Sequence, residues 1–198
     1  MLFAKPLAEL IAELEKLPGV GPKSAQRLAY HLLRVPSHEA VALSSAILAA
    51  KEKLRFCLRC QNISEFEECE ICRDVRRDKT VMCVVAEPRD IVALERINDY
   101  KGRYHVLHGL MSPVDGIGPE QLRIRELLGR LHEEPVEEII VATNPTIEGD
   151  TTALYLAKLL KPIGIKITRI AHGMPSGGEL DYADSATLLS AMEFRREM

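Results

Sequence analysis

The feature that most constrains the fold is an alternation of short apolar runs with longer helical segments from Thr80 onward. The runs are "VMCVVA", "RYHVLHG", "EEIIVAT" and "IKITRIA", and the segments between them are "PRDIVALERIN", "PEQLRIRELLGRLHEE" and "TTALYLAKLL". Strands that alternate with helices of this length are typical of a parallel sheet flanked by helices. A strand that is buried on both faces is continuously apolar, as "VMCVVA" is. The sequence therefore predicts an α/β domain.

The residues before the first cysteine predict a small helical module. Apolar residues recur at i, i+3, i+4 and i+7 across residues 7–17, which indicates an amphipathic helix. The string "LPGVGP" ends this helix, and we expect a second helix from Pro22, which is tolerated at a first helical position, to Arg34. A third helix is expected to run to about Leu54, with Ser37 as its N-cap.

Four cysteines between the helical module and the α/β domain predict a metal site. Cys57 and Cys60 form one Cys-x-x-Cys pair, and Cys69 and Cys72 form a second pair after eight intervening residues. Two such pairs at short range can place four thiolates around a tetrahedral Zn²⁺. Because four thiolates close the coordination shell, the zinc is expected to be structural, one ion per chain. Redox chemistry is the alternative, but neither pair opens a helix after a strand, as that use prefers.

The residues around these cysteines leave one question open. Six basic side chains could either neutralise the charge of the zinc thiolates or contact phosphates; they are Arg55, Arg59, Arg73, Arg76, Arg77 and Lys79. The fifth cysteine, Cys83, lies on a predicted buried strand and is expected in the core.

The stretch "LPGVGPKSAQRLAYHLL" is the second motif with a chemical consequence. Gly19 and Gly21 permit backbone torsions closed to other residues, and the side chain of Val20 between them can fill the gap between two helices. Backbone N–H groups at this turn and the following helix N-terminus would then point outward, where they suit a phosphate. Lys23 and Arg27 are spaced i, i+4 beside that turn.

This stretch resembles a helix-hairpin-helix, an element that grips the backbone of DNA without reading its sequence. The resemblance implies a DNA-binding set made of Gly19, Gly21, Lys23 and Arg27. A plain pair of helices joined by a glycine turn is the alternative. Tyr30 is the one aromatic residue nearby that could stack on a base, and its position predicts that it is in the core instead.

The α/β domain resembles the Toprim family of topoisomerases, primases and nucleases. The stretch "VMCVVAEPRDIVALE" ends its strand at an acid, Glu87, and "IIVATNPTIEGDTTALYLAKLL" matches the second motif of that family. Toprim enzymes hold Mg²⁺ on the first acid and on an Asp-x-Asp. Asn144 and Thr146 stand where the two aspartates should be, while Glu148 and Asp150 continue the match. The substitutions remove two negative charges, so Mg²⁺ binding and catalysis are not expected.

The order of these elements, with the tail "ELDYADSATLLSAM", resembles the RecR family of bacterial recombination mediators along essentially the whole chain. The resemblance implies a DNA repair protein that works with RecO and RecF to load RecA on gapped single-stranded DNA. It also implies a homo-oligomer, a tetrameric ring, built by exchange of terminal segments. By the same resemblance Lys23 and Arg27 contact DNA. The expected surface for a protein partner comprises Glu87, Asn144, Glu148 and Asp150.

Two other functions are considered. A metal-dependent nuclease or topoisomerase-like Toprim enzyme would use Glu87, Glu148 and Asp150. An acid in "GGELDYAD" could suggest nucleotide binding, but the chain carries no G-x-x-x-x-G-K-[ST] loop, so ATP hydrolysis is not expected. Asp181 and Asp184 are expected to cap the last helix or face a neighbouring subunit. No catalytic role is assigned to the histidines His105, His108 and His172.

Composition sets the remaining expectations. The net charge is −3, with +2 on residues 1–79 and −5 on residues 80–198, an asymmetry that suits a polyanion at one end and a protein at the other. No apolar run approaches a transmembrane length and the N-terminus resembles no signal peptide, so we expect a cytoplasmic, nucleoid-associated protein. The expected modules are a helix-hairpin-helix at 1–54, a zinc finger at 55–79, a Toprim domain at 80–172, and a C-terminal loop and helix for oligomerisation at 173–198.

Overall fold

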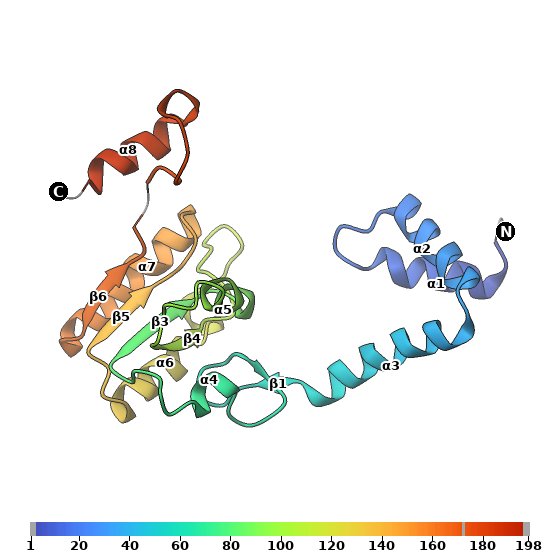
Figure 1. Cartoon of the computed structure of the whole chain (residues 1–198), viewed down its shortest axis with the longest axis horizontal. Coiled ribbons are helices and arrows are strands. Elements are labelled where there is room, and N and C mark those ends of the chain that lie inside the picture. The colour runs from blue at the N-terminus through green and yellow to red at the C-terminus, as the bar shows by residue number, and fades with distance from the viewer. Residues whose placement is uncertain (1–2, 172, 196–198) are drawn as a thin grey trace. The chain divides into compact units, whose positions relative to one another are not determined.

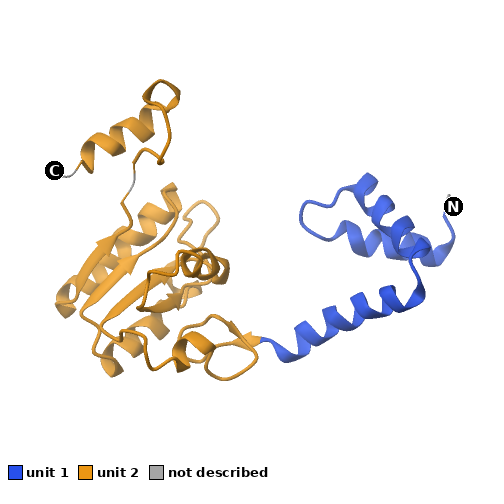
Figure 2. Cartoon of the chain, in the orientation of Figure 1, with its two compact units in different colours: residues 1–54 blue, residues 55–198 orange. Residues whose placement is uncertain are grey.

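The computed structural model describes residues 3–171 and 173–195. The chain divides into two compact units, residues 1–54 and residues 55–198 (Figure 2). The first unit contains helices only, and the second contains all the strands (Figure 1). No helix within the described ranges is both long and apolar enough to cross a membrane.

The first unit is a three-helix module with a small core. Its helices are α1 (Lys5–Glu15), α2 (Pro22–Arg34) and α3 (Ser37–Lys53), and the predicted bounds of the second helix are confirmed. Ile11 of α1 packs on Ala25 and Ala29 of α2. The prediction that Ser37 caps α3 is wrong by one position: Pro36 is the N-cap and Ser37 is the first helical residue. Helix α3 has no buried residue within the chain.

The second unit is built on a four-stranded parallel sheet, as predicted. Its strands are β3 (Val81–Val85), β4 (Arg103–Val106), β5 (Glu138–Val141) and β6 (Lys166–Arg169), in the order β4-β3-β5-β6 (Figure 1). Because β3 pairs with β4 on one side and with β5 on the other, the chain reverses its direction of winding between β3 and β5. In open α/β sheets, ligands bind outside the carboxyl ends of the strands at such a switch point.

Helices cover both faces of this sheet, since alternate strand residues point to opposite sides. One face packs on α6 (Ile124–Glu133) and α7 (Ile147–Leu160) through Met82, Val84, Ile139, Val141, Leu127, Leu156 and Leu160. The other face packs on α5 (Pro88–Glu95) through Cys83, Val85, Tyr104, Val106 and Ile91. Cys83 is thus a core residue, as expected, and burial raises the pKa of its thiol to about 12.

Local sequence explains where the helices begin. Helix α7 starts at Ile147, ahead of the predicted "TTALYL", because the Thr146 hydroxyl accepts a hydrogen bond from the Gly149 N–H at 3.1 Å and caps it. The segment expected as one helix from Pro119 is instead a short 3-10 turn, Pro119–Gln121, followed by α6 from Ile124. The tail forms α8 (Ser185–Glu193), whose N-cap is Asp184.

The cysteine segment belongs to the second unit. It consists of a two-residue strand pair, β1 (Arg55–Phe56) with β2 (Ile63–Ser64), and one turn of helix, α4 (Glu70–Arg73). The four cysteines form its buried centre, with Ile71 packed against them. Ile71 also packs against the sheet core, so the cysteine segment shares apolar contacts with the α/β domain.

Candidate functional site

The four cysteines form a site that fits a structural zinc ion. Cys57, Cys60, Cys69 and Cys72 are buried, and their sulfur atoms all lie within 4.8 Å of one another. At a Zn–S distance of about 2.3 Å, tetrahedral geometry separates sulfurs by about 3.8 Å. The backbone N–H of Cys69 donates to the Cys57 sulfur at 3.3 Å, a contact that stabilises a thiolate. Four sulfurs leave no open position, so such an ion holds the fold and does no chemistry.

The zinc segment is fixed to the α/β domain by polar contacts. The Val106 N–H donates to the Cys60 carbonyl at 2.9 Å, so this segment extends the hydrogen bonding at the end of β4. The His108 ring contacts the Gln61 carbonyl through Nε2 at 2.8 Å and packs on the Phe56 ring, with 4.2 Å between centroids. These contacts give His108 a structural role.

A buried carboxylate joins three arginines at the same junction. Glu134, at the end of α6, accepts from Arg59 Nε at 2.9 Å, Arg103 Nη1 at 3.0 Å and Arg130 Nε at 3.0 Å. Burial alone would raise the pKa of this carboxyl, but the arginine hydrogen bonds outweigh it and lower the pKa to about 2. Nothing in the local sequence singled out Glu134, because Arg59 lies 75 positions away.

Most of the basic residues around the zinc ligands are engaged within the chain. Arg77 pairs with Glu95, Arg76 pairs with Asp74, and the Arg73 guanidinium lies over the Phe66 ring at 4.6 Å. These contacts engage the three arginines with side chains other than the cysteines, so the two uses expected of them, neutralising the zinc thiolates and contacting phosphates, both stay predictions.

His105 is a core residue. Its side chain is fully buried on β4, and its Nε2 contacts the Arg123 carbonyl at 2.7 Å. Burial lowers the pKa of His105 to about 4, so the ring stays neutral at physiological pH. His172 lies outside the described residues.

The glycine turn between α1 and α2 has the geometry of an anion site. Gly19 has φ +78°, a left-handed conformation that favours glycine, and Val20 packs against the small core as expected. Gly21, which could also adopt such torsions, instead has a φ of −84° and a ψ of 172°, which suit any residue. No side chain caps α2, and an open hollow of about 430 Å³ lies at its start, lined by Gly21, Pro22, Lys23 and Ser24.

The two predicted cations lie beside this turn on one face of α2. Lys23 and Arg27 are both exposed, and neither forms an ion pair with any part of the chain that the structure describes. By contrast, Lys5 and Lys16 beside α1 pair with Glu9 and Glu13. The turn therefore presents unpaired backbone donors and two free positive charges together, which is an arrangement that binds phosphate.

The Toprim residues gather at the carboxyl edge of the sheet, on both sides of the switch point. Glu87 follows β3 as the N-cap of α5, and Asn144 follows β5. Glu148 and Asp150 lie exposed in the first turn of α7. Gly149 between them packs tightly, because a Cβ there would lie 2.0 Å from the Asn144 carbonyl oxygen.

These groups are a poor match for Mg²⁺. The Thr146 hydroxyl already caps α7, and Asp150 pairs with Arg169 at 2.5 Å. Within residues 3–171 and 173–195, the only group of three or more His, Cys, Asp or Glu close enough to hold an ion is the four cysteines. The edge thus retains the Toprim backbone without a carboxylate cluster.

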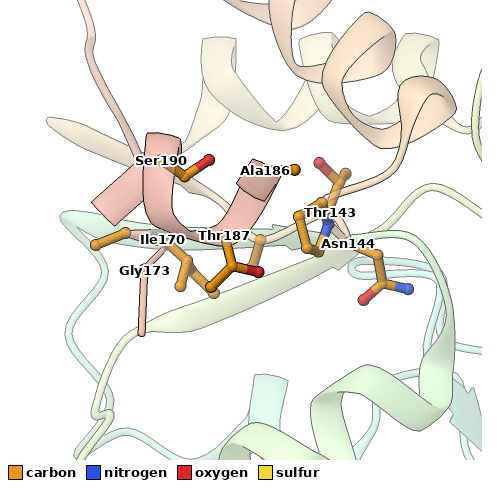
Figure 3. Close-up of a pocket in the computed structure, with 10 residues that line it drawn as sticks. Thr143, Asn144, Ile170, Gly173, Ala186, Thr187 and Ser190 are labelled. Carbon is orange, nitrogen blue, oxygen red and sulfur yellow. The ribbon is translucent and has the colours of Figure 1, made fainter. Parts of the chain in front are cut away.

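A pocket of about 500 Å³ adjoins this edge. It is formed by the segments that follow β5 and β6 and by one side of α8, and its lining includes Thr143, Asn144, Ile170, Thr187 and Ser190 (Figure 3). The side chain of Asp184 accepts from the N–H groups of Ala186 and Thr187, so this acid caps α8, one of the two roles expected for it. Asp181 lies in a short 3-10 turn and does not cap α8.

Two features of α2 were not predicted from the sequence. Tyr30, expected in the core, is 44% exposed, and that expectation is wrong. It lines an open groove on α2 with Lys23, Gln26, Arg27, His31 and Arg34. Their spacing at i, i+3, i+4, i+7, i+8 and i+11 was the available signal for a single polar stripe.

These features define the class of the protein as a multi-module zinc protein of Toprim fold. A glycine-turn hairpin comes first, a four-cysteine zinc segment follows, and this segment is fixed to a parallel sheet that has the Toprim residues at its carboxyl edge. Family models match the same regions. They are the RecR helix-hairpin-helix at residues 7–51, the RecR four-cysteine zinc finger domain at 54–74, the Toprim domain at 80–171, and the RecR C-terminal region at 173–196.

Full-length relatives agree with these matches. The chain is 59% identical over 196 residues to the recombination protein RecR of Heliobacterium modesticaldum, covering 99% of this chain and 98% of that protein. It is 56% identical over 193 residues to the RecR protein of Myxococcus xanthus, and 57% identical over 196 residues to that of Pelotomaculum thermopropionicum, with 98% or more of each chain covered. The chain belongs to the RecR family.

Proposed function

We propose that this chain is a DNA-binding mediator of recombinational repair that acts through its hairpin and does no Toprim chemistry. It binds the DNA backbone without reading sequence and, together with RecO and RecF, helps load RecA on gapped single-stranded DNA. The relatives that it matches over nearly their whole length are named recombination proteins. A protein that acts on chromosomal DNA in this way would have a cytoplasmic, nucleoid-associated location.

One observation carries the DNA assignment. Lys23 and Arg27 lie unpaired beside the uncapped start of α2, whereas Arg59, Arg103 and Arg130 are held by Glu134 and Arg77 is held by Glu95. Free cations and exposed N–H groups at one point are what a phosphate needs. The proposed contact set is therefore Gly19, Gly21, Lys23 and Arg27, with the two glycines contributing backbone.

The absence of catalysis is supported by the state of the Toprim edge. An enzyme that transfers phosphoryl groups needs carboxylates that hold Mg²⁺ close together. Asn144 and Thr146 replace two of them, and the charge of Asp150 is offset by Arg169. Incubating the protein with labelled DNA and Mg²⁺ or Mn²⁺ tests this point: cleavage that Glu87→Gln abolishes would show a Toprim enzyme instead.

The same edge is proposed as the surface for a basic protein partner, RecO. Of the expected set Glu87, Asn144, Glu148 and Asp150, the structure leaves Glu148 the most available acid, because it is exposed and forms no ion pair among the described residues. Asp150 contributes less, since Arg169 already offsets its charge.

Glu148→Ala is expected to weaken RecO binding several-fold and to leave DNA affinity unchanged. The measurement is titration of RecO against the full chain, with Glu133→Ala, another exposed acid at the end of α6, as the matched control. RecA loading on gapped DNA covered by single-strand-binding protein should fall in parallel with RecO binding. Equal loss of RecO and DNA binding would indicate misfolding and would contradict the assignment.

Assembly into a tetrameric ring is part of the proposal. Helix α3 supports it, because apolar side chains on several of its faces are exposed in the single chain, among them Val41, Leu43, Ile47 and Leu48. A second copy could cover them. The division into modules at 1–54, 55–79, 80–172 and 173–198 is proposed on the same basis, with the last module serving assembly; its boundary residue 172 and residues 196–198 lie outside the described chain.

A further inference from the structure

The polar stripe of α2 extends well beyond the two hairpin cations. Lys23, Arg27 and Arg34 lie on one helix face with His31, over a rise of about 16 Å. Helix α2 contains no acid, and none of the three cations forms an ion pair within the part of the chain that the structure describes. This stripe is the longest unneutralised positive surface that one element presents among the described residues of the first unit.

Tyr30 occupies the middle of that stripe. It lies three residues after Arg27 and four before Arg34, so all three side chains are neighbours on the helix surface. Tyr30 is 44% exposed and helps form a groove of about 510 Å³ with the cations. The core of the first unit uses a different face of α2, that of Ala25 and Ala29, so Tyr30 is not needed there.

We propose that Tyr30 stacks on an unpaired base while Lys23, Arg27 and Arg34 hold the adjacent phosphates, which gives the chain a preference for single-stranded DNA. This inference rests on the proposed DNA-binding function and extends it. An aromatic ring flanked by cations is the combination that binds single strands, since every base offers a face for stacking. In a duplex the faces are already stacked, so Tyr30 has nothing to bind.

A second protein copy fits this stripe less well. Two such surfaces meeting about a twofold axis would bring six cations together with no acid from α2 to offset them. The exposed apolar residues Leu28 and Leu33 lie beside the stripe and suit a protein contact better. Charge complementarity therefore favours nucleic acid.

The test compares full-length variants on labelled oligonucleotides of one length: a single-stranded oligo-dT, the same backbone with abasic sites, and a duplex. Tyr30→Ala is expected to lose about tenfold in affinity for oligo-dT, with little change on the abasic strand or the duplex. Tyr30→Phe, which keeps the ring, should bind as the parent does. Val114→Ala, which removes an exposed apolar side chain from the second unit, is the control.

The salt dependence of affinity distinguishes base stacking by Tyr30 from phosphate binding by the cations. Arg34→Ala should reduce the slope of log affinity against log salt by about 0.7 on single strands, whereas Tyr30→Ala should leave that slope unchanged. Parental affinity for oligo-dT in Tyr30→Ala, an equal loss on all three ligands, or a changed oligomer mass would overturn the stacking role. Parental affinity for all three ligands in the double variant Lys23→Ala with Arg27→Ala would instead overturn the proposed function, so the two failures are distinguishable.

Discussion

The environments of single residues differ in how well the amino-acid sequence predicts them. The four zinc ligands were predictable because Cys-x-x-Cys spacing is itself a geometric constraint. Glu134 was not, because its environment is assembled from strand β4, helix α6 and the zinc segment. The prediction for Tyr30 was wrong because helical periodicity shows which residues share a face of the helix, but not whether another element covers that face.

Glu134→Gln tests the junction at the residue scale. Removing the charge leaves Arg59, Arg103 and Arg130 around a neutral amide, so the free energy of unfolding should fall by about 3–5 kcal/mol. Denaturant unfolding measures it, and Glu133→Gln, an exposed neighbour, should change stability by less than about 0.5 kcal/mol. Equal stability of both variants would mean that the arginines are not held by Glu134.

The same carboxylate predicts a pH dependence. Its folded pKa of about 2 lies below the ordinary value of 4.5, so its contribution is complete above pH 4.5 and is lost as pH falls toward 2. The parent chain should therefore lose more stability than Glu134→Gln across that interval. Parallel pH profiles would contradict the assignment; loss of zinc in acid affects both proteins and cancels in the difference.

At the scale of elements, the order of strands and helices was predictable because apolar periodicity records burial directly. The residues at which the helices begin were harder to predict. Thr146 moves the start of α7 back to Ile147 by capping it, and the break between Gln121 and Ile124 divides a segment whose apolar pattern is continuous. The Toprim edge was predictable as a location, because the carboxyl ends of parallel strands meet there, but the pairing of Asp150 with Arg169 of β6 was not.

Gly149→Ala tests the start of α7. A Cβ at this position would lie 2.0 Å from the Asn144 carbonyl oxygen, a backbone atom that cannot move freely. We expect a loss of about 1–3 kcal/mol in stability and a displaced Glu148, with weaker RecO binding. Gly129→Ala in α6 is the control: nothing lies within 4 Å of its added Cβ, so it should gain about 0.5–1 kcal/mol. Unfolding curves for the two variants that shift in the same direction would contradict this account.

At the scale of the whole molecule, the two compact units carry different sites. The first unit presents the free cations of α2, and the second carries the zinc site and the Toprim edge. The asymmetry of charge in the sequence, +2 before residue 80 and −5 after it, anticipated this separation. The sequence could not indicate how copies of the chain assemble. Exposed apolar residues such as those of α3 do not identify the surface of another copy that would cover them.

DNA binding through the hairpin is tested most directly by the salt dependence of DNA affinity for Lys23→Ala with Arg27→Ala. If these cations bind phosphates through the hairpin, the double variant should bind more weakly and its log–log salt slope should fall by roughly 1.5. Lys5→Ala with Lys16→Ala removes the same charge from the region of α1, where Glu9 and Glu13 already offset it, and should leave the slope near the parental value. A parental affinity and slope in the hairpin variant would contradict DNA binding by Lys23 and Arg27.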